Sequence, residues 1–405
     1  MIIPRWIQFF IGIVSFFAAQ LYAPRRGKWV FTSFHGRGYR GNTAALFEYL
    51  CRTGTEDPVW LSSNPSIVQM VRSRFGPDRA FVMHSPAALR QLAQAEALFL
   101  THGTSDFAFL WLPRHALRIQ TWHGPPTKRG DYLPVDPAHP PGWFERRILN
   151  YRFGPISFYL SSSAECTRQF GRKFNAPPEK FWLTGFPAYD ALCTSPSKTE
   201  QAGHFWPKAP KAKRLILYAP TWRKKSRTRW FPFNDVHLEH VAEFLEENDA
   251  LMALRAHPND AFSIEPYAEV SPRFVDGSQA VVEEVTRLLL AADVLVSDYS
   301  SIYLEGLLCD IPLVFLPYDL AEYERGSLYT YEEVTPGSKP STQTAFLQAL
   351  EQGLKGAAEY ACQRQQVRER FFEHTDGKAS ERVVHQVRAH LGRQHTPRFR
   401  PPGSF

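Results

Sequence analysis

Short apolar segments alternate with amphipathic segments along most of this chain. Runs of apolar residues predict buried strands, and segments with apolar residues every three or four positions predict helices that cover them. The expected strands are Trp29–Phe34, Val59–Ser62, Leu98–Thr101, Ile119–Trp122, Phe158–Ser161, Leu215–Ala219, Leu251–Ala256, Val294–Ser297 and Leu313–Leu316. The expected helices are Thr43–Arg52, Ile67–Phe75, Val236–Glu247, Val282–Ala292, 342–354, 357–373 and 378–392. This alternation predicts an α/β fold with parallel sheets and helices on both faces.

The alternation is interrupted by a Ser/Thr/Lys/Pro-rich stretch after Asp190. We therefore expect an N-terminal Rossmann-like domain over residues 28–192, a linker over 193–212 and a C-terminal Rossmann-like domain over 213–393 that includes the closing helices. Two such halves of similar size predict domains that face each other across a cleft. Residues 394–405 are expected to form a disordered tail.

Residues 1–27 are expected to associate with a membrane. Residues 6–24 hold no charged side chain, and arginines flank them on both sides. Their length is near the ~20 residues that a helix needs to span a bilayer. Four small or polar residues recur on one helical face: Gln8, Gly12, Ser15 and Ala19. That face favours a helix lying in the membrane interface, while a spanning helix and a cleaved signal peptide remain open alternatives.

Composition and charge narrow the class of partner. The 405 residues are 14% aromatic and 21% charged, as in folded proteins, and the net charge is +7. Residues 204–230 hold nine Lys or Arg and no acid, and the densest part of this run follows a strand's carboxyl end. Such a position predicts an anionic ligand or an anionic membrane surface. The sequence has no zinc-finger spacing, RNA-binding motif or recognition helix, which argues against a nucleic-acid partner.

The five cysteines are scattered, odd in number and without CxxC spacing. This pattern argues against a disulfide framework and a metal knuckle, and for a reducing cytoplasm. We therefore expect neither a metal ion nor a cofactor.

The segment after the expected strand Val294–Ser297 is the strongest candidate for a phosphate site. Asp298, Ser300 and Ser301 stand at the start of a helix expected to run to Leu308. Free backbone N–H groups and the helix dipole favour an anion there. Glu305 lies one turn later, where it is placed to reach a ribose. The alternative is that Asp298 and Ser300 only cap the helix.

Gly36, Gly38 and Gly41 form a literal G-x-G-x-x-G between an expected strand and an expected helix. A dinucleotide site also needs an acid at the end of the next strand, and this chain has Ser63 there. The pattern therefore argues against nicotinamide or flavin. We expect the glycines to let a loop turn tightly at the cleft, with Asn42 capping the following helix.

Two histidines follow expected strands. His123 lies in the segment Trp122–Lys128, where Gly124 and two prolines predict a rigid turn, and its imidazole suits a general base. A structural histidine packed by Trp122 is the alternative. His257 and Arg255 face opposite ways if their strand continues through both, so that one meets a diphosphate and the other braces the fold.

Two further positions are weaker candidates for site residues. His102, after Leu98–Leu100, is more typical of a structural residue. Tyr318 and Asp319 follow the last expected strand, where an acid orders Arg or Lys near phosphates, binds glycerol hydroxyls or serves the fold.

In this order, the motifs resemble those of the CDP-glycerol glycerophosphotransferase family, which includes teichoic acid primases and polymerases. The matching segments cover about residues 28–340: Phe31–Asn42, Trp122–Gly124, Thr184–Pro187 with Asp190, Tyr218–Arg223, Arg255–Pro258, Asp298–Ser301, Tyr318–Asp319 with Tyr323, and Thr335–Gly337. The resemblance implies two Rossmann-like domains of the GT-B type, with the donor mainly on the C-terminal one.

The resemblance also implies a reaction. An alditol phosphate, most directly glycerol phosphate, passes from a CDP-alditol to a hydroxyl of a glycan or polyprenyl lipid-linked acceptor, and CMP leaves. The product is a teichoic acid or capsule-like polymer, made at the cytoplasmic face of the cell membrane. A sugar-nucleotide glycosyltransferase of the same architecture is the alternative.

Four site residues follow from the same resemblance. His123 and His257 map to two histidines that matter for transfer, and Ser300 and Ser301 map to pyrophosphate ligands. The other expected donor residues are Arg223, Arg255, Asp298 and Glu305. The expected acceptor or cleft residues are Gly38, Asn42, Lys128, Tyr318 and Asp319.

The sequence departs from the family pattern at several positions. Pro125 and Thr127 replace a usual Thr and Leu, and Ala188 replaces a usual Arg. Glu305 stands where Asp is usual. The first three changes lie in the N-terminal half, so they leave the identity of the acceptor and of the alditol open.

Overall fold

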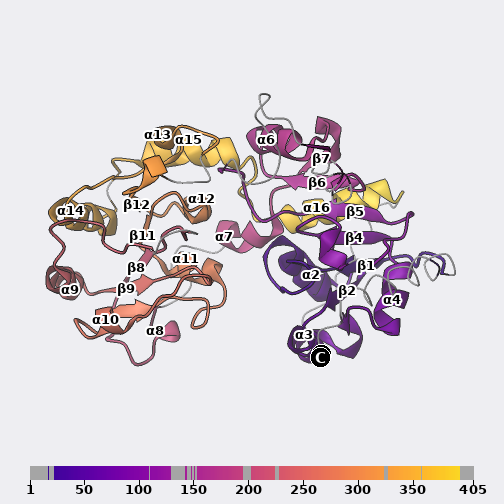
Figure 1. The fold of residues 1–405 in the computed structure, drawn as a ribbon, viewed down its shortest axis with the longest axis horizontal. Helices are drawn as coiled ribbons and strands as arrows, with labels where there is room; N and C mark the ends of the chain where they lie inside the picture. Colours follow the sequence, from indigo (N-terminus) through magenta and orange to yellow (C-terminus); the bar gives the residue numbers. More distant parts are fainter. Residues whose placement is uncertain are drawn as a thin grey trace. The chain divides into compact units, whose positions relative to one another are not determined.

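The structure is a computed structural model, and it describes residues 17, 22–108, 110–128, 142–143, 147, 150, 153–194, 202–223, 228–322, 327–356 and 358–392. The chain forms two compact units, each built around one parallel sheet (Figure 1). The first unit comprises Met1–Gly124, Tyr132–Asp190 and Asp376–Phe405, and the second comprises Pro125–Asp131 and Ala191–Thr375. The predicted α/β class with parallel sheets is confirmed.

The first unit holds a seven-stranded parallel sheet in the order β3-β2-β1-β4-β5-β6-β7. Its strands are β1 (Lys28–Phe31), β2 (Asp57–Ser62), β3 (Ala80–Val82), β4 (Ala97–Leu100), β5 (Leu117–Gln120), β6 (Phe158–Ser161) and β7 (Phe181–Leu183). β1 is buried over its whole length, and Phe31 stacks on Phe99 with ring centroids 4.4 Å apart. The order reverses between β1 and β4, which is where doubly wound folds bind ligands.

The helices of the first unit include one that we had expected elsewhere. They are α2 (Gly41–Thr53), α3 (Pro65–Phe75), α4 (Pro86–Ala93), α6 (Ala164–Phe174) and α16 (Ala379–His390). The prediction that α16 belongs to the C-terminal domain is wrong, because this helix is part of the first unit. Asp190 accepts the N–H groups of Ala379 and Ser380 at 2.8 and 2.9 Å, and Arg388 donates to Glu56 at 2.8 Å. These contacts fix the returning helix on the first unit.

The second unit holds a five-stranded parallel sheet in the order β10-β9-β8-β11-β12. Its strands are β8 (Arg214–Tyr218), β9 (Ala250–Leu254), β10 (Phe274–Asp276), β11 (Val294–Ser297) and β12 (Leu313–Phe315). Its helices, with α7 at the boundary, are α7 (Asp190–Thr194), α8 (Ala202–Phe205), α9 (Leu238–Glu247), α10 (Glu265–Ala268), α11 (Val285–Ala291), α12 (Ile302–Leu308), α13 (Tyr331–Val334), α14 (Gln343–Leu354) and α15 (Ala361–Phe371). The switch point of this sheet lies between β8 and β11.

Helices cover both faces of the second sheet (Figure 1). On one face, Val294 and Val296 of β11 join a buried core with residues of α9 and α14. On the other face, a Cβ at Gly306 of α12 would lie 3.0 Å from the Leu295 side chain. Alternate residues of one strand therefore serve the two helical layers, as the continuous apolar runs predicted.

Part of the expected linker is packed rather than free. Trp206, just after α8, is buried, and its indole N–H donates to the carbonyl oxygen of Asp276 at 2.8 Å. This contact attaches the segment after α8 to the second sheet. Residues 195–201 lie outside the described residues.

The expected N-terminal helix lies almost wholly outside the described residues, which include only Phe17 and the chain from Tyr22 onward. Within the described ranges, no helix has the length and apolar character needed to cross a bilayer. The tail expected over 394–405 also falls outside those ranges.

Candidate active site

His123 follows β5, close to the switch point of the first unit. Trp122 has a φ of 53° and Gly124 a φ of 142°, so the backbone turns sharply on both sides of the histidine. A Cβ at position 124 would lie 2.6 Å from the Tyr189 hydroxyl, so a side chain does not fit there. The turn is thus fixed by its surroundings as well as by the two prolines that follow.

Asn42 braces this turn from α2. Its amide group donates to the carbonyl oxygens of Thr121 and Trp122, both at 3.0 Å, and its oxygen accepts the N–H of Ala188 at 3.1 Å. The expected helix cap is wrong, because the N-cap residue is Arg40 and Asn42 lies inside the first turn. Asn42 is 1% exposed, so its side chain holds the peptide before His123 in place.

His123 is exposed, and its ring packs against two aromatic rings. Trp122 stacks against it with centroids 4.2 Å apart, and the His102 ring lies 5.4 Å away at an interplanar angle of 16°. The surrounding protein, together with the charges of His102, Lys173 and Arg40, lowers the pKa of His123 below its ordinary value. The imidazole is therefore neutral at pH 7, which is the form that a general base requires.

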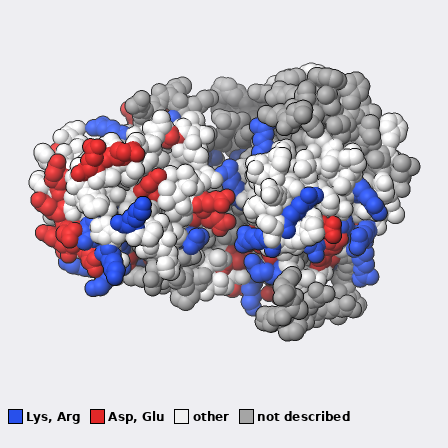
Figure 2. Space-filling view, turned by 90° about the horizontal axis from the view of Figure 1, so that it is seen from below, with Lys and Arg blue, Asp and Glu red and all other residues white. Residues whose placement is uncertain are grey.

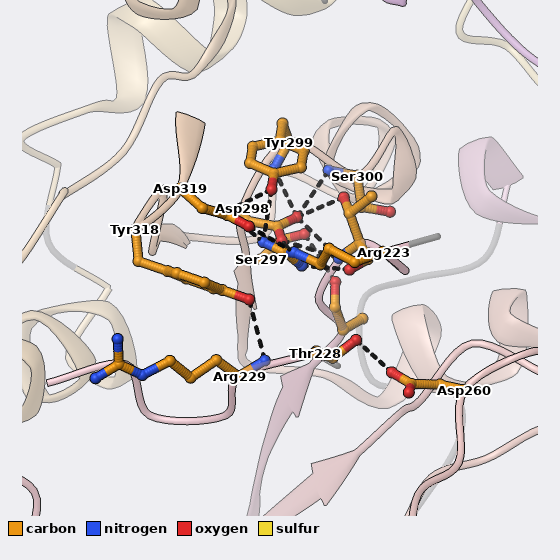
Figure 3. A network of polar contacts seen from close by, with 12 residues as sticks. Arg223, Thr228, Arg229, Asp260, Ser297, Asp298, Tyr299, Ser300, Tyr318 and Asp319 are labelled. Carbon is orange, nitrogen blue, oxygen red and sulfur yellow. Dashed lines mark hydrogen bonds and ion pairs between the residues drawn. The ribbon is translucent and has the colours of Figure 1, made fainter. Parts of the chain in front are cut away.

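In the second unit, Asp298 forms the centre of the turn after β11 (Figure 3). Its carboxylate accepts the backbone N–H groups of Thr221, Tyr299 and Ser300 at 2.6 to 3.0 Å, and the Thr221 hydroxyl at 2.6 Å. Asp298 is 1% exposed. It thus joins the loops after β8 and β11 across the switch point, and its oxygens are occupied by the protein.

Arg223 lies against this turn with a buried guanidinium (Figure 3). The group is 2.8 Å from Asp298, 2.7 Å from Asp319 and 2.6 Å from the Tyr299 hydroxyl. Burial opposes its charge, but the hydrogen bond to Asp319 and the charge of Asp298 outweigh burial and raise the pKa of Arg223. The guanidinium is therefore a strut between two carboxylates.

Ser300 is half-buried and Ser301 exposed, directly before α12. The helix begins at Ile302, two residues later than predicted, because the Asp298 carboxylate binds the N–H of Ser300. Ser301 occupies the N-cap position without a side-chain capping bond. The structure thus makes Asp298 the residue that binds the free N–H groups of the turn.

Arg255 is bonded to the backbone of its own unit and is influenced electrostatically by Glu305. Arg255 donates to the carbonyl oxygens of Gly277, Val282 and Glu283 at 2.7, 2.9 and 3.4 Å. Burial lowers the pKa of Arg255 to about 10, and the Glu305 carboxylate opposes that shift. Of the pair Arg255 and His257, the arginine is the one that braces the fold.

His257 is exposed beyond β9. Its Nδ1 accepts the N–H of Asn259 at 3.1 Å, so a neutral ring carries its proton on Nε2 and can donate it in a hydrogen bond to an anion. The Trp222 ring lies 5.6 Å away. A pocket of about 520 Å³ opens beside His257, with Asp276 and Ser278 in its lining.

The residues expected near the acceptor are divided between the units. Gly38 and Asn42 belong to the first unit, and Lys128, Tyr318 and Asp319 belong to the second. Lys128 forms an antiparallel bridge with Ser327. The Tyr318 hydroxyl accepts the N–H of Arg229 at 3.0 Å, as Figure 3 shows. Residues that we expected in one group therefore belong to two different units of the fold.

The charged surface is mixed. In Figure 2, acidic side chains gather mainly on the second unit, while Lys and Arg occur on both units. In the part of the chain that the structure describes, no group of three or more His, Cys, Asp or Glu side chains is arranged to hold a metal ion.

Three residues of the network around Asp298 were not among the site residues expected from the sequence. Thr221 binds Asp298, and the Tyr299 hydroxyl donates to Asp319 at 2.5 Å. Both residues lie inside segments that match the family motifs, so the sequence did point to them. The Tyr331 hydroxyl of α13 donates to the carbonyl oxygen of Asp298 at 2.7 Å. The two residues are 33 positions apart in the sequence, and no local pattern predicts their contact.

Comparison with known proteins identifies the family. Residues 15–389 match the family described as CDP-glycerol:poly(glycerophosphate) glycerophosphotransferase. The chain belongs to this family. The resemblance read from the motifs is confirmed, and the protein is a glycerophosphotransferase-type enzyme.

Curated relatives of the family differ in length. The teichoic acid glycerol-phosphate transferase of Staphylococcus aureus (strain NCTC 8325 / PS 47) is 26% identical over 386 residues, which covers 90% of this chain and 93% of the relative. The teichoic acid poly(glycerol phosphate) polymerase of Bacillus subtilis (strain 168) is 25% identical, over 88% of this chain but 48% of the polymerase. The chain thus spans nearly all of the first relative and about half of the second.

Solved structures show the same architecture. The wall teichoic acid polymerase TagF matches with a TM-score of 0.75 at 21% identity, covering 95% of this chain and 94% of that one. A UDP-N-acetylglucosamine 2-epimerase matches with a TM-score of 0.54 at 14% identity, covering 92% and 98%. At such identities the likeness shows the fold alone.

Proposed function

We propose that this protein transfers glycerol phosphate from CDP-glycerol to a hydroxyl of a glycan or lipid-linked acceptor, with release of CMP. The reaction belongs to the synthesis of teichoic acid or a capsule-like polymer. The observation that carries the proposal is the family match over residues 15–389. The relative of similar length is a glycerol-phosphate transferase, which favours glycerol over ribitol as the alditol.

The second unit supplies the groups that bind the donor. The hydroxyls of Ser300 and Ser301 and the Nε2–H of His257 donate to pyrophosphate oxygens, and they stabilise the charge that develops as CMP leaves. Glu305 accepts a ribose hydroxyl. The buried network of Arg223, Asp298 and Asp319 supports this proposal because it fixes the serine turn before any ligand arrives.

The first unit supplies the base. The acceptor oxygen attacks the alditol-side phosphorus in line, and its hydroxyl proton passes to His123. As the new P–O bond forms, the bond to the CMP oxygen breaks. The fixed turn supports this role because it holds the imidazole in one place, and the lowered pKa of His123 keeps the ring in the neutral form that a base requires.

The enzyme works at the cytoplasmic face of the cell membrane, peripherally or through its N-terminal segment. A nucleotide-activated donor and a lipid-linked acceptor meet at that face. All five cysteines are free thiols, which fits a reducing compartment.

A donor screen tests the proposal. The full chain is incubated separately with CDP-glycerol, CDP-ribitol and a UDP-sugar in the presence of a lipid-linked acceptor, and released CMP and UDP are measured. We expect CMP from CDP-glycerol, less from CDP-ribitol, and no UDP. UDP release would establish a sugar-nucleotide glycosyltransferase instead, and no release from any donor would refute the proposed transfer.

A further inference from the structure

The loops at the switch point of the first unit contain a buried carboxylate that the proposed reaction does not use. Asp106 is 0% exposed. Its oxygens accept the backbone N–H groups of His35, Thr101 and His102 at 2.7, 2.6 and 2.9 Å. The Thr101 hydroxyl also donates to Asp106, at 2.9 Å. A carboxylate with this many donors fixes the loop after β4 in one conformation.

The same hydroxyl connects Asp106 to the ring of His102. Thr101 Oγ1 lies 2.8 Å from His102 Nδ1 and accepts the N–H of Phe34 at 3.0 Å. A hydroxyl has one proton, and an ionised carboxylate can only accept. The Thr101 proton therefore goes to Asp106, and His102 must donate from Nδ1. In the neutral ring this leaves Nε2 as the basic nitrogen.

His102 connects this chain of bonds to the proposed base. Its ring lies 5.4 Å from the His123 ring and nearly parallel to it, and 4.8 Å from the ring of His35. The His102 side chain is 16% exposed, so it is held within the protein while the His123 ring beside it is open to solvent. The order Asp106, Thr101, His102, His123 thus runs from a buried charge to the reacting surface.

We propose that His102 is a positioning residue for His123, oriented through Thr101 by the buried carboxylate of Asp106. The proposal rests on the proposed function, since it assigns a role within the same reaction. The His123 ring packs against the rings of both His102 and Trp122, and these two rings also lie 6.0 Å from each other, so the three form one cluster. The Nε2 of His102 lies on the opposite side of its ring from Nδ1, which is bonded to the Thr101 hydroxyl.

Charges around His123 give the proposal a measurable signature. His102 acts on His123 from the loop after β4, Lys173 from α6 and Arg40 from the loop before α2, and each lowers the pKa of His123. Among the described residues, His35 and Asp106 are further ionisable groups beside His102, and the Tyr189 hydroxyl lies beside Gly124. Replacing His102 by a neutral side chain removes one of these causes, so the pKa of His123 should rise toward its ordinary value.

The test compares the wild type with His102→Gln, and with Thr101→Ser and Thr101→Val as a matched pair. In His102→Gln we expect kcat to fall at least tenfold, the donor KM to change less than twofold, and the acid limb of kcat/KM to move to higher pH. Thr101→Ser keeps the hydroxyl and should retain activity, whereas Thr101→Val should behave like His102→Gln.

A control and a second measurement separate this inference from the proposed function. His84→Gln changes another histidine of the first unit, which is buried and bonds the carbonyl oxygen of Ala108, and should leave the pH profile unchanged. Histidine-selective NMR titration, with His123→Ala for assignment, reports the pKa of His123 without turnover.

An unchanged His123 titration and kcat in His102→Gln would overturn the inference while leaving the transfer reaction intact. A wild type that releases no CMP would overturn the proposed function, and the NMR titration would still decide whether the two rings are coupled.

Discussion

At the scale of single residues, the candidate site separates exposed side chains from side chains that are buried in the protein. His123, Ser301 and His257 are exposed, whereas Asp298 and Asn42 are each 1% exposed and fully bonded inside. In the sequence, the charge of a side chain does not show whether it will be exposed or buried. Burial distinguishes them, because a buried ion or amide must find partners within the fold.

The role of His123 predicts a specific kinetic loss. His123→Ala should reduce turnover at least ~100-fold, the range for loss of a general base, and should leave donor affinity nearly unchanged. The reason is that the proposed donor groups lie in the second unit, whereas His123 lies in the first. Single-turnover rates and calorimetric titration with CDP-glycerol measure the two quantities. A variant that keeps more than a tenth of the wild-type rate at saturating donor would remove His123 from this role.

The Arg223 strut predicts a loss of local stability. Asp319→Asn removes one of the two carboxylates that hold the buried guanidinium. We expect a loss of about 2 kcal/mol, below the range for fully buried pairs, because the Asp319 side chain is 24% exposed. Hydrogen exchange of peptides covering 294–305 measures this loss locally.

The control for this variant is Asp310→Asn, whose partner is Arg364 and whose side chain is 57% exposed. It should cost less than about 1 kcal/mol. Burial opposes ionisation of Asp319, but the bond to Arg223 outweighs it and holds the pKa of Asp319 below its ordinary value. The stabilisation is therefore full above about pH 4 and is lost as the pH falls through the lowered pKa. Equal exchange rates in both variants would contradict the strut.

At the scale of elements, the proposed donor binding at the turn before α12 depends on the hydroxyls of two serines. Because Asp298 takes the N–H groups of Tyr299 and Ser300, these two amides are already bonded. The double variant Ser300→Ala with Ser301→Ala should therefore weaken CDP-glycerol binding at least tenfold and also slow transfer. Calorimetry measures the affinity, and Ser341→Ala, an exposed serine of the same unit, is the matched control. Unchanged affinity in the double variant would place the pyrophosphate elsewhere.

Apolar runs were predictable from the sequence, including the short edge strand β12, whereas the edge strands β3, β7 and β10 were not. β1, β4, β8 and β11 coincide with predicted strands, because a strand buried on both faces shows an uninterrupted apolar run. β3, β7 and β10 have three residues each, which is too short for any periodicity. Their positions depend on register with a neighbour, as in the pairing of Ala80 with Trp60.

The candidate site likewise contains features that the sequence predicts and features that it does not. The turns that carry His123 and Ser300 follow strands and contain Gly, Pro, Asp or Ser, so sequence could locate them. The partners that hold those turns come from distant segments. Asn42 is 80 residues from Trp122, and Asp298 is 77 residues from Thr221. Such contacts depend on the order of strands in each sheet, which local patterns do not encode.

At the scale of the whole molecule, each unit brings one half of the proposed chemistry to its own switch point. In the first unit the loops after β1 and β4 meet beside His123, and in the second the loops after β8 and β11 meet at Asp298. The helix α16 returns to the first unit after the second is complete. The chain therefore crosses between its two units more than once, so neither unit is a single continuous segment.

The final prediction concerns the N-terminal segment. Deleting residues 1–24 should leave a folded protein that still uses a water-soluble acceptor, because β1 begins at Lys28 and no strand of the described sheet is lost. The Arg25 N–H, which bonds the carbonyl oxygen of Gln94 at 2.9 Å, also remains. Membrane binding should fall, since the apolar run 6–24 is removed.

Flotation with anionic liposomes at low and high salt measures this loss. Arg25, Arg26, Lys28 and the basic run 208–229 should leave a weaker binding that salt abolishes, because screening suppresses attraction between surface charges. Circular dichroism and turnover with the soluble acceptor confirm that the truncated protein is folded. If the truncated protein floats as well as the full chain at high salt, membrane attachment resides outside residues 1–24.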